Sequence, residues 1–287
     1  MVPADQQLAR ERIRSFLTWL ALITVVLEVL VALASRWEGS WLFRALAILV
    51  TWSPAMAAWV AGRRTGRPLA DIGFHRPTAG LMLIGYGIPI AYTFAVYGFV
   101  WGTGLGHFYD GARLDKMTVS LGLGHLTPLR AFVAVGLIYP SLIWLGGCAM
   151  SLGEEIGWRG FLLPELAKVM PFPRACVISG LAWAVWHYPL IIFGGYHGHT
   201  HLLYSMACFT LVIVAISFPL AWLRLKSGNV WTCTAFHASH NLFMLKLLNP
   251  LTQDTGCTRW LVSEFGIVTV VVTAVMAWGF WKSAQKH

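Results

Sequence analysis

The chain has 287 residues, of which 57% are hydrophobic and only 11% are charged, and its mean hydropathy is +0.65. These values exclude an ordinary soluble domain and indicate a polytopic membrane protein. The formal net charge is +9. Basic loops facing anionic lipid account for such a charge in a membrane protein, so it gives no indication of nucleic-acid binding.

Several apolar segments are long enough to cross a hydrocarbon core of ~30 Å, which takes about 20 residues each. We therefore predict an all-α polytopic membrane protein, one membrane domain over residues 1–287, with about eight transmembrane helices and the active site buried in the bundle. The first segment is expected to be a retained anchor, because no small-residue cleavage site follows it. The segments lie near 15–35, 41–61, 80–102, 131–152, 175–194, 202–223, 229–248 and 261–281.

The loops between these segments differ in their content of Lys and Arg. Cytoplasmic loops collect such residues, and fourteen of the 21 basic residues fall on one side of the predicted topology, Lys286 among them. We expect both termini to be cytoplasmic, with a bacterial plasma membrane as the location. The five cysteines form no CxxC pair, and we interpret them as small hydrophobic residues rather than a disulfide framework.

Three charged residues, Glu154, Glu155 and Arg159, interrupt the fourth apolar segment. Charges at such depth are costly and usually functional. Glu155 and Arg159 are spaced i, i+4 with the acid first, which predicts an ion pair. Glu154 points about 100° away on a helix, so it is left to face other partners, where it could act as a general base or acid.

The same segment is too long for one straight membrane helix. Continuous helix from 130 to 168 would be nearly twice the membrane thickness at ~1.5 Å per residue. We expect it to bend or break at proline or glycine. The available sites are Pro140, Gly146, Gly147, Gly153 and Pro164.

Two later apolar segments carry histidines, His187 on one and His237 on the other. Measured from the nearest basic loop residue, Glu154, His187 and His237 lie at depths of roughly 20, 20 and 16 Å. Three segments are therefore expected to bring polar groups to one level. His237 and Asn241 share a helical face and could present an imidazole and an amide N–H to one oxygen, as in an oxyanion hole. His240, one turn away, is the second candidate for the working imidazole.

Structural explanations compete with this functional one. A Glu–Arg pair in a membrane can be a clamp or part of an ion path, and a lone histidine can be a packing residue. A transporter would also place ionisable groups at mid-membrane, but internal repeats or paired broken helices are not visible. His197, His199 and His201 stand at alternate positions of one loop, where they would suit a metal if the loop were extended, or are exposed polar groups.

Over roughly residues 137–245 the chain resembles the CPBP family of intramembrane proteases, which includes the CAAX prenyl endopeptidases of the Rce1 type. The family has three motifs: two glutamates and an arginine after three residues, an aromatic residue and a histidine separated by three residues, and a histidine separated likewise from asparagine or aspartate. Tryptophan stands here where phenylalanine is usual in the second motif. The matching residues are Glu154, Glu155 and Arg159, then Trp183 and His187, then His237 and Asn241.

The resemblance implies hydrolysis of peptide bonds of membrane-associated proteins or peptides, prenylated ones among the candidates. It implies a water molecule activated by Glu154 and His187, and an oxyanion stabilised by His237 and Asn241. A scaffold that uses the fold without catalysis, as in bacteriocin self-protection, is the rival interpretation.

Zinc is the one cofactor to consider. Held by His187, His237 and an acid, with water in the open position, it would use the same residues. We favour the metal-free route, in which Glu154 is the base directly, because the sequence shows no groups that would orient zinc ligands.

Overall fold

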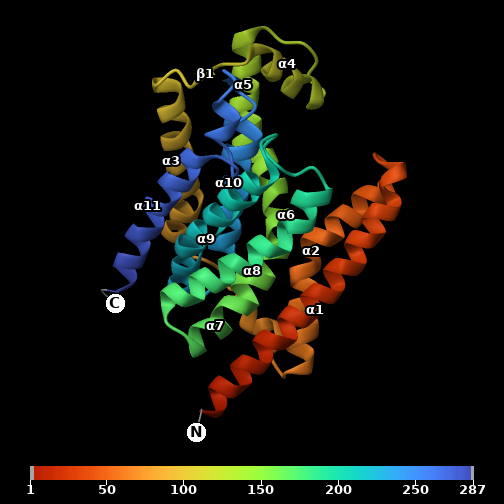
Figure 1. Ribbon diagram of the computed structural model, residues 1–287, viewed down its shortest axis with the longest axis vertical. Helices are drawn as coiled ribbons and strands as arrows, with labels where there is room; N and C mark the ends of the chain where they lie inside the picture. Colours follow the sequence, from red (N-terminus) through yellow and green to blue (C-terminus); the bar gives the residue numbers. More distant parts are fainter. Residues whose placement is uncertain (1–2, 286–287) are drawn as a thin grey trace.

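The computed structural model describes residues 3–285, so Lys286 lies outside the described residues. Long helices running up and down form one bundle, and the N-terminus lies at its lower end in Figure 1. The helices are α1 (Ala4–Ala34), α2 (Trp41–Arg64), α3 (Ala79–Gly102), α4 (Gly111–Ser120), α5 (Pro128–Ile138), α6 (Trp144–Glu155), α7 (Leu163–Val169), α8 (Phe172–Phe193), α9 (Leu202–Ser227), α10 (Trp231–His240) and α11 (Ile267–Ala284).

The predicted all-α polytopic class is confirmed. Within residues 3–285, seven helices are long and apolar enough to cross a membrane. The eighth segment predicted, 229–248, is also helical, because α10 continues directly into the π-helix η5 (Asn241–Leu248). It is missing from the seven because His237, His240, Asn241 and Lys246 reduce its hydropathy. Its residues are mostly buried, so this helix is a central element that the others surround.

The last predicted segment, 261–281, begins late, because α11 starts only at Ile267. The residues before it form a loop with a short strand, β2 (Thr252–Asp254), and a 3₁₀ turn, η6 (Thr258–Trp260). Strand β2 pairs antiparallel with β1 (Gly106–Phe108), Gly106 lying opposite Asp254. This two-stranded sheet is a small exception to the all-α prediction, and it joins the loop after α3 to the loop before α11.

The fourth predicted segment does not break. It runs from Pro128 to Val169 as one helical stretch of 42 residues. Its α-helical register is interrupted twice by π-helix, η3 (Tyr139–Ile143) and η4 (Ile156–Leu162). Pro140 lies inside the first, and η4 lies between Gly153 and Pro164, so two of the expected sites flank it. A π-turn admits an extra residue and accommodates irregular hydrogen bonding without ending a helix.

Glycines let other helices approach the polar ones closely. A Cβ on Gly157 of η4 would stand 2.4 Å from the Cβ of Pro54 in α2, and one on Gly153 would stand 2.7 Å from the ring of Trp52. A Cβ on Gly85 of α3 would stand 2.5 Å from the carbonyl oxygen of Thr232 in α10. Larger residues at these positions would push α2 and α3 away from the helices that carry Glu154 and His237.

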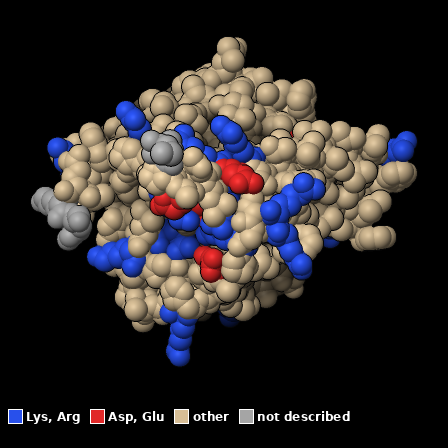
Figure 2. Space-filling model, turned by 90° about the horizontal axis from the view of Figure 1, so that it is seen from below, with Lys and Arg blue, Asp and Glu red and all other residues tan. Residues whose placement is uncertain are grey.

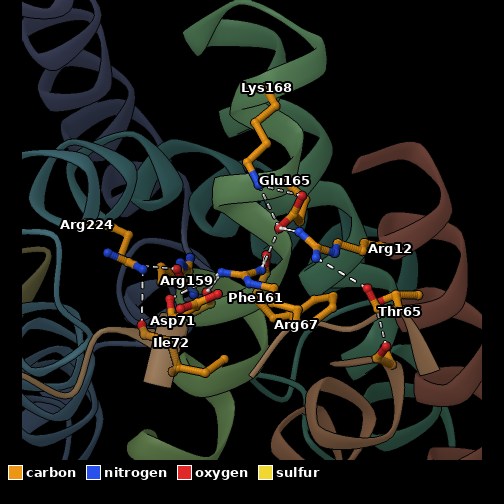
Figure 3. Close-up of polar contacts among 12 residues, drawn as sticks. Arg12, Thr65, Arg67, Asp71, Ile72, Arg159, Phe161, Glu165, Lys168 and Arg224 are labelled. Atoms are coloured by element: carbon orange, nitrogen blue, oxygen red, sulfur yellow. Dashed lines mark hydrogen bonds and ion pairs between the residues drawn. The ribbon is translucent and has the colours of Figure 1, made fainter. Parts of the chain in front are cut away.

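Two arginines bind three consecutive carbonyls of η4 (Figure 3). Pro164 has no N–H. It therefore cannot donate a hydrogen bond to the carbonyl of Gly160, as in an α-helix, or to the carbonyl of Arg159, as in a π-helix. Arg67 donates to the carbonyls of Gly160 and Phe161, both at 2.9 Å. Arg224 donates from Nε to the carbonyl of Arg159 at 2.8 Å. Side chains from two other parts of the chain thus replace the missing helix hydrogen bonds.

An ion-pair cluster lies next to these arginines. Glu165, which is fully buried, pairs with Arg67 at 3.0 Å, Arg12 at 3.4 Å and Lys168 at 2.9 Å. The cluster ties α1 and the loop after α2 to α7. Seen from this end of the bundle, Lys and Arg side chains surround a few acidic ones (Figure 2), as expected for an end that faces a basic aqueous boundary.

Replacing Arg67 with alanine is expected to lower the thermal unfolding temperature markedly. The change leaves two buried carbonyls without a donor, at about 1–3 kcal/mol each, and removes one cation from Glu165. Thermal unfolding of purified protein in detergent measures the effect. Arg63→Ala is the matched control, because Arg63 is exposed on α2. Similar unfolding temperatures for the two variants would contradict the stabilising role of Arg67 at η4.

Candidate functional site

Glu154 lies near the end of α6, with only 7% of its surface exposed. One of its carboxylate oxygens accepts a hydrogen bond from the indole Nε1 of Trp183, in α8, at 2.8 Å. Among the described residues it forms no ion pair within 4.0 Å. Its carboxylate is thus fixed in place by a neutral donor and keeps its remaining lone pairs for a ligand or water.

Glu155 faces a different set of partners. Its Oε1 lies 2.9 Å from Arg159 Nη1 and 2.9 Å from His237 Nδ1, and all three side chains are buried. The predicted Glu155–Arg159 ion pair is therefore confirmed, and the two adjacent acids do address different partners. Arg159 also donates to Ser217 at 3.3 Å and lies over the Trp183 ring at 4.1 Å.

His187 is half-buried on α8. Its Nδ1 lies 3.0 Å from the carbonyl oxygen of Trp183, and because a carbonyl only accepts, Nδ1 carries a proton and donates it. Nε2 is the nitrogen left for chemistry. The rings of Trp186 and Phe209 contact the imidazole edge-on, with centroids at 4.7 and 5.0 Å, so its orientation is fixed by packing as well.

Trp183 lies at the centre of the site. Its indole N–H binds Glu154, its ring centroid lies 5.1 Å from that of His237, and 6.1 Å from that of His187. Glu155, the neighbour of Glu154 in α6, lies 2.9 Å from His237 Nδ1. Residues of α6, α8 and α10 therefore meet at one level, as the depth argument predicted.

Asn241 and His240, the other two candidate residues of this helix, differ in their hydrogen bonding. Asn241 is the first residue of η5 and is half-buried, and no hydrogen bond of its side chain is found among residues 3–285. Its part in an oxyanion hole stays a prediction. His240 binds Tyr92 through Nδ1 and Glu264 through Nε2. With both nitrogens engaged, His240 is not available as the working imidazole.

The structure gives no support for a metal at the histidine loop. His199 has a left-handed backbone, with φ of 54°, so residues 197–201 are not extended and the alternate side chains do not line up. His199 and His201 are exposed and His197 is half-buried. This loop fits the interpretation as polar surface.

A zinc ion held by His187 and His237 would need further ligand side chains close to them. Across residues 3–285, no group of three or more His, Cys, Asp or Glu side chains is arranged to hold a metal ion. Buried Glu155 Oε2 has no hydrogen-bond partner, but it is one oxygen where zinc needs three or four ligands. The side chains as arranged do not form a zinc site, and participation of zinc stays a prediction.

The comparisons with known proteins place this site in a class. Residues 136–243 match the family of type II CAAX prenyl endopeptidases, Rce1-like, and all the predicted site residues lie within that range. The resemblance to the Rce1 type of the CPBP family is thereby confirmed for this segment.

The chain is also similar to a particular archaeal protein. The chain is 28% identical over 127 residues to "CAAX prenyl protease 2" of Methanococcus maripaludis, an alignment covering 43% of this chain and 44% of that protein. The chain thus matches less than half of the length of this curated relative.

Sequence reasoning missed two partners of the acids. It treated Trp183 only as the aromatic residue of a motif, whereas its indole N–H binds Glu154. It assigned Glu155 to Arg159 alone, whereas His237 shares the same oxygen. The first signal was present in the sequence, because tryptophan differs from phenylalanine in having a hydrogen-bond donor.

Trp183→Phe is expected to fold but to lose stability by about 1–3 kcal/mol, because it leaves the buried Glu154 carboxylate without its donor. Trp144→Phe is the matched control, since the Trp144 indole binds only the neutral hydroxyl of Ser239, at 3.0 Å. Thermal unfolding of both variants measures the difference. A loss for Trp144→Phe as large as that for Trp183→Phe would contradict a special role for the Trp183 N–H.

Proposed function

We propose that the protein is an intramembrane endopeptidase that hydrolyses peptide bonds of membrane-associated proteins or peptides. One observation supports this best. In the Rce1-like segment, Glu154 is fixed by an indole N–H while the nearby cation, Arg159, is engaged by Glu155. A carboxylate held without a salt bridge, by a tryptophan whose ring lies near those of His187 and His237, is suited to take a proton from water.

In the reaction we propose, water lies against Glu154 and attacks the carbonyl carbon of the peptide bond. Glu154 takes the proton as the oxygen–carbon bond forms. His187, whose Nε2 is free, assists in moving that proton to the leaving nitrogen as the carbon–nitrogen bond breaks. The products are a carboxylate and an amine.

The tetrahedral intermediate carries negative charge on oxygen, which needs positioned donors. His237 donates from Nδ1 to Glu155, so it can donate from Nε2 to the oxyanion only when the ring is protonated. Glu155 is the anion beside that ring, and it is shared with Arg159. Asn241 supplies an amide N–H as the second donor.

Substrate and orientation complete the proposal. The relative from Methanococcus maripaludis is named for prenylated substrates, and prenylated peptides are therefore one class to test beside unprenylated ones. Arg12, Arg67, Lys168 and Arg224 gather at the end where the N-terminus lies. From the distribution of basic residues we propose that this end is cytoplasmic and that both termini lie on that side. The proposed location is a bacterial plasma membrane.

Cleavage is the direct test. Wild-type protein in lipid should hydrolyse members of a quenched fluorescent peptide library that includes prenylated and unprenylated sequences. Glu154→Ala should abolish cleavage while the unfolding temperature stays close to that of the wild type. Measurement with and without a chelator tests zinc, because the metal-free route predicts unchanged activity.

The rival interpretations give other results. Loss of activity with chelator, restored by zinc, would contradict the metal-free route. Absence of cleavage by folded wild type across the library would contradict the protease proposal and favour a non-catalytic scaffold.

The two glutamates should differ in their effect on folding. Glu155→Ala leaves Arg159 as a buried unpaired charge, and Arg159→Ala leaves Glu155 with His237 alone. Each should cost about 3–5 kcal/mol and reduce the yield of folded protein and the activity together. Thermal unfolding beside Glu154→Ala measures this, and equal loss of folded protein in all three variants would contradict the division of roles.

A further inference from the structure

A second buried acid, Glu264, lies outside the three family motifs. It is 3% exposed and belongs to the loop between η6 and α11. Its Oε1 lies 2.8 Å from His240 Nε2, and its Oε2 accepts a hydrogen bond from the hydroxyl of Tyr196. The hydroxyl of Tyr92 binds the other nitrogen of His240. Four buried or half-buried side chains from different parts of the chain thus form one hydrogen-bonded network.

The network has a defined direction of donation. Because a carboxylate accepts, Nε2 of His240 donates to Glu264, and Nδ1 of the neutral ring then accepts from the Tyr92 hydroxyl. Tyr196 donates to the second oxygen, so both oxygens of the carboxylate are occupied. Burial alone would raise the pKa of Glu264, but the hydrogen bonds from His240 and Tyr196 hold this pKa below its usual value.

An unusual turn directs Glu264 inward. The preceding residue, Ser263, has a positive φ of 63°, a region that non-glycine residues rarely adopt. Its hydroxyl accepts the backbone N–H of Phe265 at 3.3 Å. Phe265 packs against Tyr196 and Phe209, with centroids at 5.3 and 5.7 Å. Strained backbone that the surroundings hold in place is typical of functional sites.

Tyr196 connects this network to the candidate active site. Its ring lies stacked against His187, with centroids 6.5 Å apart and planes at 28°. Tyr196 therefore stands between the Glu264 carboxylate, to which its hydroxyl donates, and the His187 ring. Phe209 contacts both rings, so the imidazole and the phenol share one packed wall.

We infer that Glu264 is a positioning residue of the proposed protease: by binding the hydroxyl of Tyr196 it fixes the aromatic wall against which His187 stands. The inference rests on the proposed function for its catalytic consequence, whereas the coupling between Glu264 and His187 is a property of the folded protein. Partners that orient the histidine ligands of metal sites contribute about 10- to 100-fold to activity, and we expect an effect of the same order for this imidazole.

The coupling can be measured without any substrate. In protein labelled with ¹⁵N-histidine, the ring nitrogen signals of His187 and His240 are assigned with His187→Asn and His240→Asn. Glu264→Gln should move both signals. Tyr196→Phe, which keeps the ring and loses only the hydroxyl, should move the His187 signal and is the second variant if Glu264→Gln fails to fold. Tyr204→Phe is the matched control, because its hydroxyl binds the backbone of Trp260 at the exposed end of the bundle.

Kinetics on the folded fraction provide the other measurement. Glu264→Gln and Tyr196→Phe should lower kcat by about 10- to 100-fold with little change in KM, while Tyr204→Phe keeps both.

The outcomes separate the two proposals. An unchanged His187 signal in Glu264→Gln, or in Tyr196→Phe if that is the variant that folds, would overturn the positioning role. So would a moved signal with unaltered kcat. If the wild type cleaves no peptide while the His187 signal moves as expected, the protease proposal fails and the coupling stands.

Discussion

In an apolar bundle, every backbone group that a helix leaves without a partner must be satisfied by another part of the protein. Here this constraint falls on the carbonyls of Arg159 and Gly160, to which Pro164 has no N–H to donate. Arg67 and Arg224 supply the donors instead. The arrangement holds η4 in its π form, and η4 in turn sets where Arg159 meets Glu155 at the level of the site.

Fold class and site level could be predicted from the sequence, because both rest on local regularities. Apolar segments of membrane length predicted the helices, and the i, i+4 spacing predicted the ion pair of Glu155 with Arg159. Counting residues from basic loops brought Glu154, His187 and His237 to one depth. Such arguments succeed where one helix fixes the geometry and the bilayer fixes its direction.

The remaining features depend on contacts between distant segments, which spacing does not encode. The fourth segment was predicted to bend or break; it stays helical throughout, and two π-turns interrupt its α-helical register instead. The membrane span predicted at 261–281 included Glu264, because one charged residue does not outweigh the apolar residues that follow it. In the structure the helix begins only at Ile267. Nothing local indicates that Glu264 meets His240 and Tyr196, and its role as a partner of the site follows only from the folded chain.

Glu264, the buried acid beside the candidate site, lies late in the sequence, in the loop that follows the β1–β2 pair. All three family motifs are complete in the sequence by residue 241, whereas Glu264 follows them and reaches the interior of the bundle from the loop before α11. Strand β2 pairs with a loop made much earlier, and that pairing brings the returning chain to the correct face. The motif residues are thus synthesised before the loop that completes their surroundings.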